Sequence, residues 1–213
     1  MNYKSFKILG MMSGTSIDGI DMTIANTNGR SLENIKNFYF EYNKDEKNTL
    51  NKIINYYDES KKNESEKFVT DVSIKALMKF GNFNKYDFIG FHGQTIFHKP
   101  NEGQSLQIGN VKKICQILKK HIIYDFRSND LIHKGQGAPI SPIYHKYIIE
   151  KLKLKLPCAF LNIGGISNLS YWDGKDLIGY DVGPGNVFLD NYMSIKMNKK
   201  YDNNGIYASR GKI

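Results

Sequence analysis

Residues 11–21 read MMSGTSIDGID and directly follow the apolar run FKILG at residues 6–10. The stretch holds two glycines, three hydroxyl side chains and two aspartates. Glycine lets backbone N–H groups approach a ligand closely, and successive N–H groups in a turn form an anion-binding nest. Two interpretations therefore stay open: a tight structural hairpin, or a loop that cradles phosphate.

The length and composition are those of an ordinary globular protein. The 213 residues suffice for one large domain or two small ones, and 40% apolar with 24% charged residues provide a normal core and surface. No apolar run reaches the roughly 18 residues of a transmembrane helix, and the N-terminus turns polar too early for a secretory signal. Cys115 and Cys158 stand alone, which argues against a zinc site or a disulfide framework. We therefore expect a cytoplasmic protein that does not bind membranes.

The net charge of +9 raises the question of nucleic-acid binding. Arg30, Arg127 and Arg210 are the only arginines, and the remaining positive charge is lysine scattered along the chain. Diffuse charge mainly affects solubility and non-specific association. We expect no specific nucleic-acid partner, only weak binding that falls steeply with salt.

Apolar periodicity predicts an α/β protein. The predicted strands cover residues 5–12, 20–26, 35–42, 86–95, 105–109 and 121–126, and the predicted helices cover 46–60, 64–80, 111–120 and 141–152. Near residue 156 the pattern restarts, with two strands around a glycine turn at 156–172, a strand and Gly/Pro loop at 176–186, and a helix at 187–198. We therefore predict an N-terminal lobe at residues 1–155 and the beginning of a second lobe at 156–213.

Polar, glycine-bearing segments follow the predicted strands. They are MSGTSIDG (12–19), FHGQT (91–95), DFRSND to GQGAP (125–139), NIGGISN (162–168) and YDVGPGN (180–186). In α/β folds ligands bind just beyond strand ends, where such loops converge. Each segment alone could be a structural turn, but five with shared features indicate a ligand site.

The first and fourth of these segments are typical of phosphate-binding loops. They match neither the Walker A motif nor the Rossmann glycine fingerprint. They fit a design in which each of two lobes contributes one glycine hairpin to a phosphate tail. Asp18 would then hold Mg²⁺ directly or through water, unless it only forms a local Asx turn.

Three further side chains are candidates for chemistry or binding. Asp181, between LIGY and GPGN, could act as general base toward water or a hydroxyl, or could cap the following helix. Arg127, beside Asp125 and Asp130, could bind a carboxylate or phosphate through two hydrogen bonds, or form a structural Arg–Asp pair. His92 could orient a ligand or a water, or simply end a strand. The other histidines show no metal-ligand spacing.

Six motifs in order carry a family resemblance: MSGTSIDGID, FHGQTIFH, LQIG, YDFRSNDL with KGQGAPISP, LNIGGISNLS and GYDVGPGN. Over nearly its whole length the chain resembles the 1,6-anhydro-N-acetylmuramic acid kinases, of the sugar kinase, actin and chaperone ATPase superfamily. The resemblance implies an actin-like (ribonuclease H-like) ATPase fold and a homodimer. It also implies a reaction that uses ATP and Mg²⁺. Water opens the anhydro ring of the sugar while the 6-oxygen is phosphorylated, which gives MurNAc 6-phosphate in peptidoglycan recycling.

The resemblance also implies roles for individual residues. The base that deprotonates water is Asp181. The implied ATP and Mg²⁺ contacts are Ser13, Gly14, Thr15, Ser16, Asp18 (also the metal ligand), Gly19, Asn162, Gly164 and Gly165. The implied sugar contacts are His92, Gln94, Arg127, Asp130, Gln136, Gly183, Gly185 and Asn186.

Two features depart from the family pattern. Lys134 stands where the family usually has the first glycine of Gly-Gly-Gln-Gly-Ala-Pro, and a lysine there strains the loop if φ is positive. Family members are also considerably longer, and the later part supplies the adenosine-binding loop. We therefore expect a C-terminally truncated kinase with little or no ATP-dependent activity on its own. The alternative function is an inactive fragment or a non-catalytic sugar- or phosphate-binding module of the same fold.

Overall fold

The structure is a computed structural model of the chain, and it describes residues 4–14, 16–81 and 86–212. Thr15, an expected ATP contact, lies outside the described residues. The helices and strands are β1 Phe6–Ser13, β2 Gly19–Thr27, β3 Leu32–Glu41, α1 Lys44–Asn55, η1 Glu59–Lys61, α2 Lys62–Phe80, β4 Phe88–Lys99, η3 Pro100–Glu102, β5 Gln104–Ile108, α3 Val111–Leu118, β6 His121–Ile123, α4 Ser128–Ile132, α5 Ser141–Leu152, β7 Cys158–Ile163, β8 Ile166–Trp172, β9 Leu177–Pro184, α6 Val187–Met197, η4 Asn203–Gly205 and η5 Ala208–Arg210. The chain divides into two compact units, Met1–Gly137 and Ala138–Ile213.

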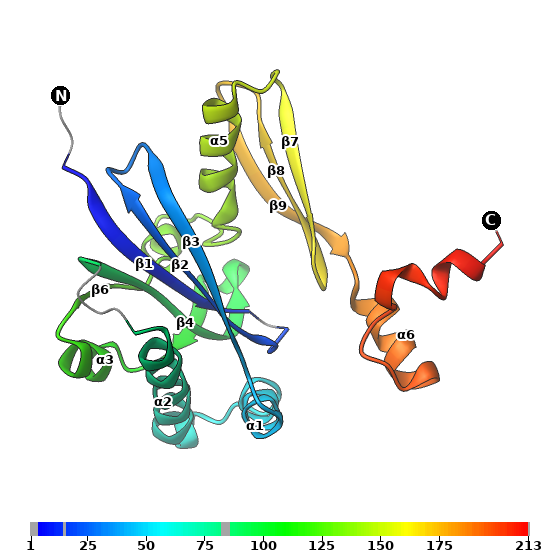
Figure 1. Ribbon diagram of the computed structural model, residues 1–213, viewed down its shortest axis with the longest axis horizontal. Helices are drawn as coiled ribbons and strands as arrows, with labels where there is room; N and C mark the ends of the chain where they lie inside the picture. Colours follow the sequence, from blue (N-terminus) through cyan, green and yellow to red (C-terminus); the bar gives the residue numbers. More distant parts are fainter. Residues whose placement is uncertain (1–3, 15, 82–85, 213) are drawn as a thin grey trace. The chain divides into compact units, whose positions relative to one another are not determined.

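The first unit is built on a mixed sheet with the strand order β3-β2-β1-β4-β5, and β6 also pairs with β4 (Figure 1). Strands β1, β2 and β3 form an antiparallel meander, whereas β4 runs parallel to both β1 and β6. The α/β class is therefore confirmed. An antiparallel β1–β2–β3 meander followed by strands parallel to β1 is also the arrangement of a ribonuclease H-like lobe.

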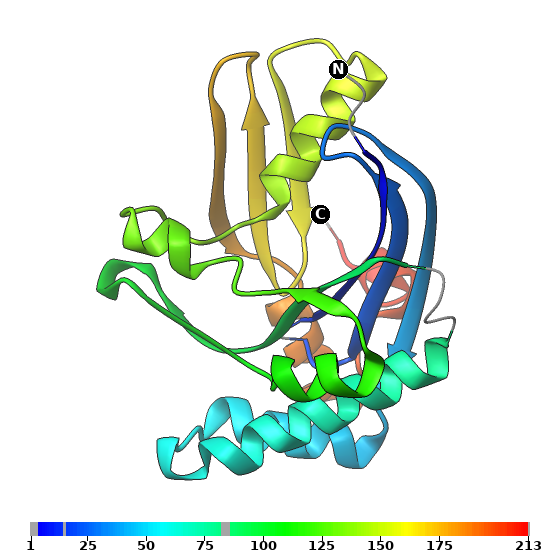
Figure 2. The same cartoon turned by 90° about the vertical axis from the view of Figure 1, so that its left-hand side faces the viewer.

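Helices α1, α2 and α3 pack on one side of this sheet (Figures 1 and 2). Their apolar residues meet those of the strands in one core. Its most deeply buried members, each at most 2% exposed, are Leu9, Ile20, Leu50, Ala76, Leu77, Tyr86, Ile89, Ile108 and Ile114. This packing follows from the alternating apolar residues of β1 and β2 and the helical spacing of α2.

The predicted helix at 46–60 is divided in the structure. Asn43 caps α1, because its side chain accepts a hydrogen bond from the Glu46 N–H, and the Asn43 N–H donates to the Glu46 carboxylate. The helix ends at Asn55, and the Asp58 side chain then caps the short 3₁₀ turn η1 by accepting from Ser60 N–H. Such local side-chain bonds compete with helix propagation, which explains the early end.

The second unit holds an antiparallel sheet in the order β7-β8-β9, with α5 packed on β8 and β9 (Figure 1). His145 of α5 stacks on the Phe160 ring at 4.8 Å between centroids and shares a 2.8 Å hydrogen bond with Ser170. Because α5 packs on this sheet, the compact units divide at Gly137, whereas the sequence predicts a lobe boundary at residue 155.

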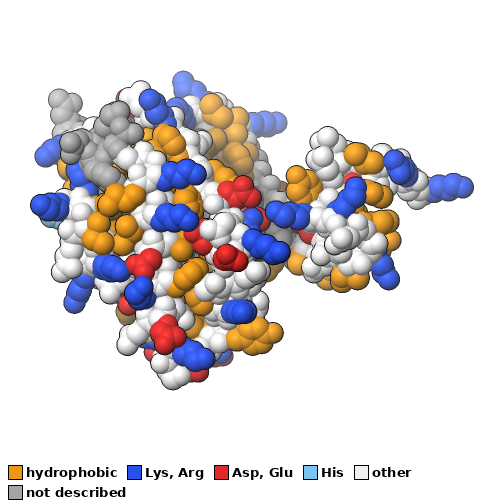
Figure 3. Space-filling view, turned by 60° about the horizontal axis from the view of Figure 1, so that its bottom comes forward, with side chains coloured by type: hydrophobic (Ala, Val, Ile, Leu, Met, Phe, Trp, Pro, Cys, Tyr) orange, Lys and Arg blue, Asp and Glu red, His pale blue; other side chains and the backbone are white. Residues whose placement is uncertain are grey.

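Charged side chains are spread over the surface. On the face shown in Figure 3, lysine and arginine side chains alternate with acidic and apolar ones and do not gather into one basic patch. Within the described residues, no helix combines the length and apolarity needed to cross a membrane. Both cysteines, Cys115 and Cys158, are free.

Candidate functional site

The loop between β1 and β2 is held tightly at its base. Its Asp18 carbonyl accepts a 3.1 Å hydrogen bond from the Tyr42 N–H, and Ile17 N–H donates to the Gly14 carbonyl at 3.4 Å. Ile17 is buried at a φ of 55°, a left-handed conformation that is costly for a β-branched residue. The surrounding structure therefore imposes a strained loop, a feature that gathers at ligand sites.

Gly19 closes this loop against β3. A Cβ at this position would lie 2.3 Å from the Phe40 carbonyl oxygen and 2.7 Å from the Tyr39 ring. The structure thus gives Gly19 a packing role, and its expected ATP contact stays a prediction. Near Gly14, by contrast, an added Cβ would meet nothing closer than the Ser16 hydroxyl at 3.6 Å, so the rim of the loop is open.

Side chains in the loop alternate between buried and exposed. Ser16 and Asp18 are exposed on either side of buried Ile17. Among the described residues, no group of three or more His, Cys, Asp or Glu side chains is arranged to hold a metal ion. Mg²⁺ commonly keeps several waters and takes one or two carboxylates together with substrate phosphates. Asp18 fits that mode of binding.

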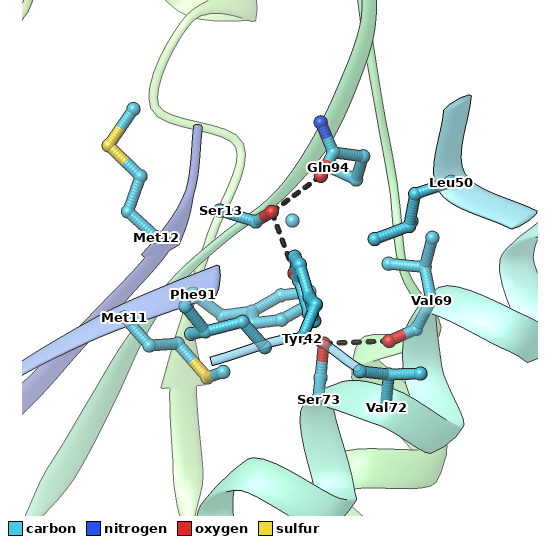
Figure 4. Close-up of a pocket in the computed structure, with 12 residues that line it drawn as sticks. Met11, Met12, Ser13, Tyr42, Leu50, Val69, Val72, Ser73, Phe91 and Gln94 are labelled. Carbon is cyan, nitrogen blue, oxygen red and sulfur yellow. Dashed lines mark hydrogen bonds between the residues drawn. The ribbon is translucent and has the colours of Figure 1, made fainter. Parts of the chain in front are cut away.

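Beneath the loop lies a buried hydrogen-bond chain (Figure 4). The Tyr42 hydroxyl donates to Ser13 Oγ at 2.7 Å, and the Ser13 hydroxyl donates to Gln94 Oε1 at 2.6 Å. Gln94 Nε2 in turn donates to the Thr95 carbonyl at 3.3 Å. These hydrogen bonds connect three parts of the sheet: the last residue of β1, the residue directly after β3, and Gln94 within β4. Ser13 and Gln94, expected to contact ATP and sugar respectively, are brought together but turned toward each other.

This chain lines a small pocket with a volume of about 10 Å³, roughly the space of one water molecule. Burial raises the pKa of Tyr42 to about 12, against the opposing effect of its hydrogen bond to Ser13. The hydroxyl therefore stays protonated and remains a donor. Sequence reasoning missed Tyr42, although Phe38, Phe40 and Tyr42 continue one period-2 pattern that ends in a ring with a polar tip.

A second cluster in the same unit centres on Arg127. Its Nε and one terminal nitrogen lie 3.1 and 2.9 Å from His92 Nε2, and the other terminal nitrogen donates to the Gly137 carbonyl at 2.9 Å. His92 Nδ1 lies 3.0 Å from the Gly93 carbonyl, which can only accept. His92 is therefore the Nδ1-protonated, neutral tautomer, and its Nε2 accepts from Arg127. Burial, and secondarily the Arg127 charge, lowers the pKa of His92.

The loop at 134–137 is fastened to α4 by Asp130. Its carboxylate accepts from the Gly137 N–H at 2.7 Å, and its backbone carbonyl accepts from the Gly135 N–H at 2.8 Å. A Cβ on Gly135 would lie 2.2 Å from the Asp130 carboxylate. The carboxylate of Asp130 thus holds the loop, and its expected contact with sugar stays a prediction. Gln136 is exposed on that loop.

In the second unit, Asp181 lies in a polar row across the sheet. Asn162 of β7 pairs with Asn168 of β8, which pairs with Asp181 of β9. Directly opposed residues on antiparallel strands project from the same face, so the three side chains share one face. Asp181 is exposed, and it is part of β9 rather than a cap of the following helix α6.

The two glycine loops of this unit are packed against each other. Gly185 N–H donates to the Gly165 carbonyl at 2.8 Å, and Asn186 N–H donates to the Gly164 carbonyl at 2.7 Å. A Cβ on Gly185 would lie 2.1 Å from the Gly164 carbonyl oxygen, so only glycine permits this approach. At Gly165 an added Cβ would meet nothing within 4 Å. Gly183 lies on β9, just before Gly185 and its contact with the glycine turn.

Each unit thus brings together its own expected site residues. In the first unit Ser13 bonds Gln94, Arg127 bonds His92, and Arg127 and Asp130 both bond the backbone of Gly137. In the second unit Asn162 and Asp181 each pair with Asn168, and Gly164 and Gly165 bond Asn186 and Gly185. The ligand-binding roles of these residues stay predictions.

Comparison with known proteins bears on the whole chain. A family model described as anhydro-N-acetylmuramic acid kinase matches residues 6–213. A curated protein of that name from Pelagibacter ubique is 40% identical over 224 residues, covering 98% of this chain and 60% of that protein. One from Bradyrhizobium diazoefficiens is 35% identical over 218 residues, covering 95% of this chain and 59% of that protein. This chain therefore spans about 60% of the length of the curated relatives that it matches.

Among solved structures, YeaZ from Pseudomonas aeruginosa covers 84% of this chain and 68% of its own, with a TM-score of 0.30 and 8% identity. A likeness this slight supports no inference about fold or function.

Proposed function

Because the chain belongs to the anhydro-N-acetylmuramic acid kinase family, we propose that it carries catalytic and binding groups of an ATP-dependent sugar kinase. The proposed substrate is 1,6-anhydro-N-acetylmuramic acid, and the product is MurNAc 6-phosphate, formed in the cytoplasm during peptidoglycan recycling. The proposal also keeps the homodimer that the resemblance implies.

In the proposed reaction Asp181 is the base that accepts a proton. Its exposed carboxylate takes a proton from water while the water oxygen forms a bond to the anomeric carbon of the sugar. The bond between that carbon and the 6-oxygen breaks, and the 6-oxygen takes the γ-phosphoryl group as the bond to the β-phosphate oxygen breaks. Products are the 6-phosphate sugar, ADP and one proton. The amide of Asn168, in the same row, supplies hydrogen bonds that orient the sugar or the water, and Asn162 keeps its proposed contact with ATP.

Backbone groups of the glycine loops would hold the phosphates. The rim of the first loop at Gly14 and Ser16, and the turn at Gly164 and Gly165, offer N–H groups and a hydroxyl to anionic oxygens. Mg²⁺ held through Asp18 would neutralise phosphate charge. No residue of the first loop is a lysine, so neutral donors and the metal share this task.

The observation that carries the proposal is the position of Asp181. An exposed carboxylate lies in an amide-lined row, on a strand whose end packs through Gly185 against the glycine turn at 164–165. A nucleophile-activating base beside a phosphate-binding turn is what the reaction requires.

Calorimetry with sugar and with Mg²⁺–ATP separately, beside a coupled assay for ADP release, tests this function. The chain spans about 60% of its relatives' length, so binding is measured as well as turnover. Binding of both ligands with sugar-dependent ADP release supports the kinase. A folded chain that binds neither ligand overturns the proposal.

The second candidate function is a non-catalytic sugar-binding module. It is favoured by the fact that His92, Arg127 and the loop fastened by Asp130 all belong to the first unit alone. This function predicts sugar binding without nucleotide binding and without ADP release.

A further inference from the structure

Arg127 carries a charge that the described part of the protein does not neutralise. None of the ion pairs among the described residues includes Arg127, although Asp125 and Asp130 lie close in sequence. Asp125 accepts hydrogen bonds from the backbone and hydroxyl of Ser128, and Asp130 holds the Gly137 N–H. The structural Arg–Asp pair that the sequence left open is therefore not formed.

The partners of Arg127 are neutral and fix its orientation. They are the imidazole of His92, from β4, and the backbone carbonyl of Gly137, from the loop after α4. A half-buried guanidinium with only neutral acceptors lacks a counter-ion, and an anionic ligand would provide one.

The hydrogen bonds also define which donors remain. Of the five guanidinium N–H groups, three point at His92 and Gly137. One N–H remains on each terminal nitrogen, and this pair matches the two oxygens of one carboxylate. His92 contributes a single Nε2 lone pair to two N–H groups, so it orients Arg127 without neutralising it.

We propose that Arg127 binds the lactyl carboxylate of the muramic acid sugar and so selects this substrate over the corresponding glucosamine sugar. The inference rests on the proposed function and deepens it, because it names the substrate group that Arg127 recognises. A phosphate shares the same anionic chemistry. However, the candidate phosphate loops offer backbone N–H nests, whereas Arg127 offers a planar pair of donors, which favours the carboxylate.

Calorimetric titration with 1,6-anhydro-MurNAc and 1,6-anhydro-GlcNAc tests the inference, because the second sugar lacks only the lactyl ether. We expect the unaltered chain to bind the acidic sugar about 10- to 100-fold more tightly, the range of a hydrogen-bonded charge pair. Arg127→Gln should reduce this preference to about one, because the affinity for the acidic sugar should fall far more than the affinity for 1,6-anhydro-GlcNAc. Arg30→Gln, the same change of charge at the turn between β2 and β3, should keep the preference.

Each contrary result has a distinct meaning. Equal affinities in the unaltered chain, or a preference that survives in Arg127→Gln, overturns the carboxylate assignment and leaves the kinase proposal standing. Weaker Mg²⁺–ATP binding in Arg127→Gln with an intact sugar preference shows a phosphate contact instead. If neither sugar binds the folded chain, the proposed function falls and the inference falls with it.

A folding check and a second variant complete the design. Thermal unfolding followed by circular dichroism shows whether Arg127→Gln folds. Arg127→Lys keeps the positive charge but loses the planar pair of donors, so the preference should fall several-fold. A full preference in Arg127→Lys overturns the two-oxygen geometry.

Discussion

Two buried tyrosines in the first unit should respond in opposite ways to loss of the hydroxyl group. The Tyr42 hydroxyl donates to Ser13 at 2.7 Å and is part of the chain that ends at Gln94. The Tyr86 hydroxyl has no hydrogen-bond partner among the described residues, although Tyr86 is only 2% exposed. Tyr→Phe keeps the ring in both cases, so the comparison isolates one oxygen atom in two environments.

The expected magnitudes follow from these environments. Tyr42→Phe removes one satisfied hydrogen bond, which should lower the free energy of unfolding by about 1 kcal/mol and Tm by about 2–4 °C. The loss stays small because water can enter the pocket beside Ser13. Tyr86→Phe removes an unsatisfied buried hydroxyl, whose desolvation costs about 1–3 kcal/mol, and should leave stability unchanged or raise it by about 1 kcal/mol.

Guanidinium unfolding curves followed by circular dichroism measure both variants. A double-mutant cycle with Ser13→Ala adds a check, because Tyr42 and Ser13 should couple by about 0.5–1 kcal/mol whereas Tyr86 and Ser13 should be additive. Equal losses in Tyr42→Phe and Tyr86→Phe, or no coupling between Tyr42 and Ser13, would refute the reasoning.

The remaining predictions concern the loops, His92 and alkaline pH. Lys134 has a φ of 66°, so Lys134→Gly should raise the free energy of unfolding by about 0.5–1 kcal/mol, and a lower denaturation midpoint would contradict this. Gly185→Ala places a Cβ against the Gly164 carbonyl and should cost about 1–3 kcal/mol and weaken Mg²⁺–ATP binding; a wild-type melting curve and titration would count against it. Burial lowers the pKa of His92, so the contribution of the neutral imidazole to the free energy of unfolding is complete above pH 6.5. The free energy of unfolding should therefore decrease as the pH falls below 6.5, and it should decrease less in His92→Gln. Burial raises the pKa of Tyr42 to about 12, so its contribution to stability is complete below pH 10 and is lost as pH rises from 10 through 12; alkaline unfolding of Tyr42→Phe should be shallower, and an unchanged profile would oppose this.

Much of the fold could be predicted from the sequence because periodicity reports burial. The alternating residues of β1 and β2 and the helical spacing of α2 gave these elements within a few residues. The predicted helix at 46–60 extended too far, since the Asp58 cap that starts a separate 3₁₀ turn is a local polar interaction. Helix α4, at Ser128–Ile132, was predicted as loop because five residues are too few for a periodic signal.

The sequence indicated which residues belong to the candidate site, but not which residues they pack against or bond to. The glycines of the first loop stood out in sequence, yet the steric reason for Gly19 depends on β3, which only the sheet register supplies. Arg127 was singled out by rarity, whereas its pairing with His92 joins residues 35 positions apart. Tyr42 was missed because nothing in its own segment reveals a partner on β1.

The most direct test of the central claim is a single-turnover reaction in ¹⁸O-labelled water, with the chain in excess over 1,6-anhydro-MurNAc and with Mg²⁺–ATP present. Product mass is read by mass spectrometry for the unaltered chain and for Asp181→Asn. We predict MurNAc 6-phosphate with one ¹⁸O at the anomeric carbon, formed about 10²- to 10⁴-fold more slowly by Asp181→Asn, which should still bind the sugar. Unlabelled product, equal rates in the two proteins, or loss of sugar binding in Asp181→Asn would contradict the account.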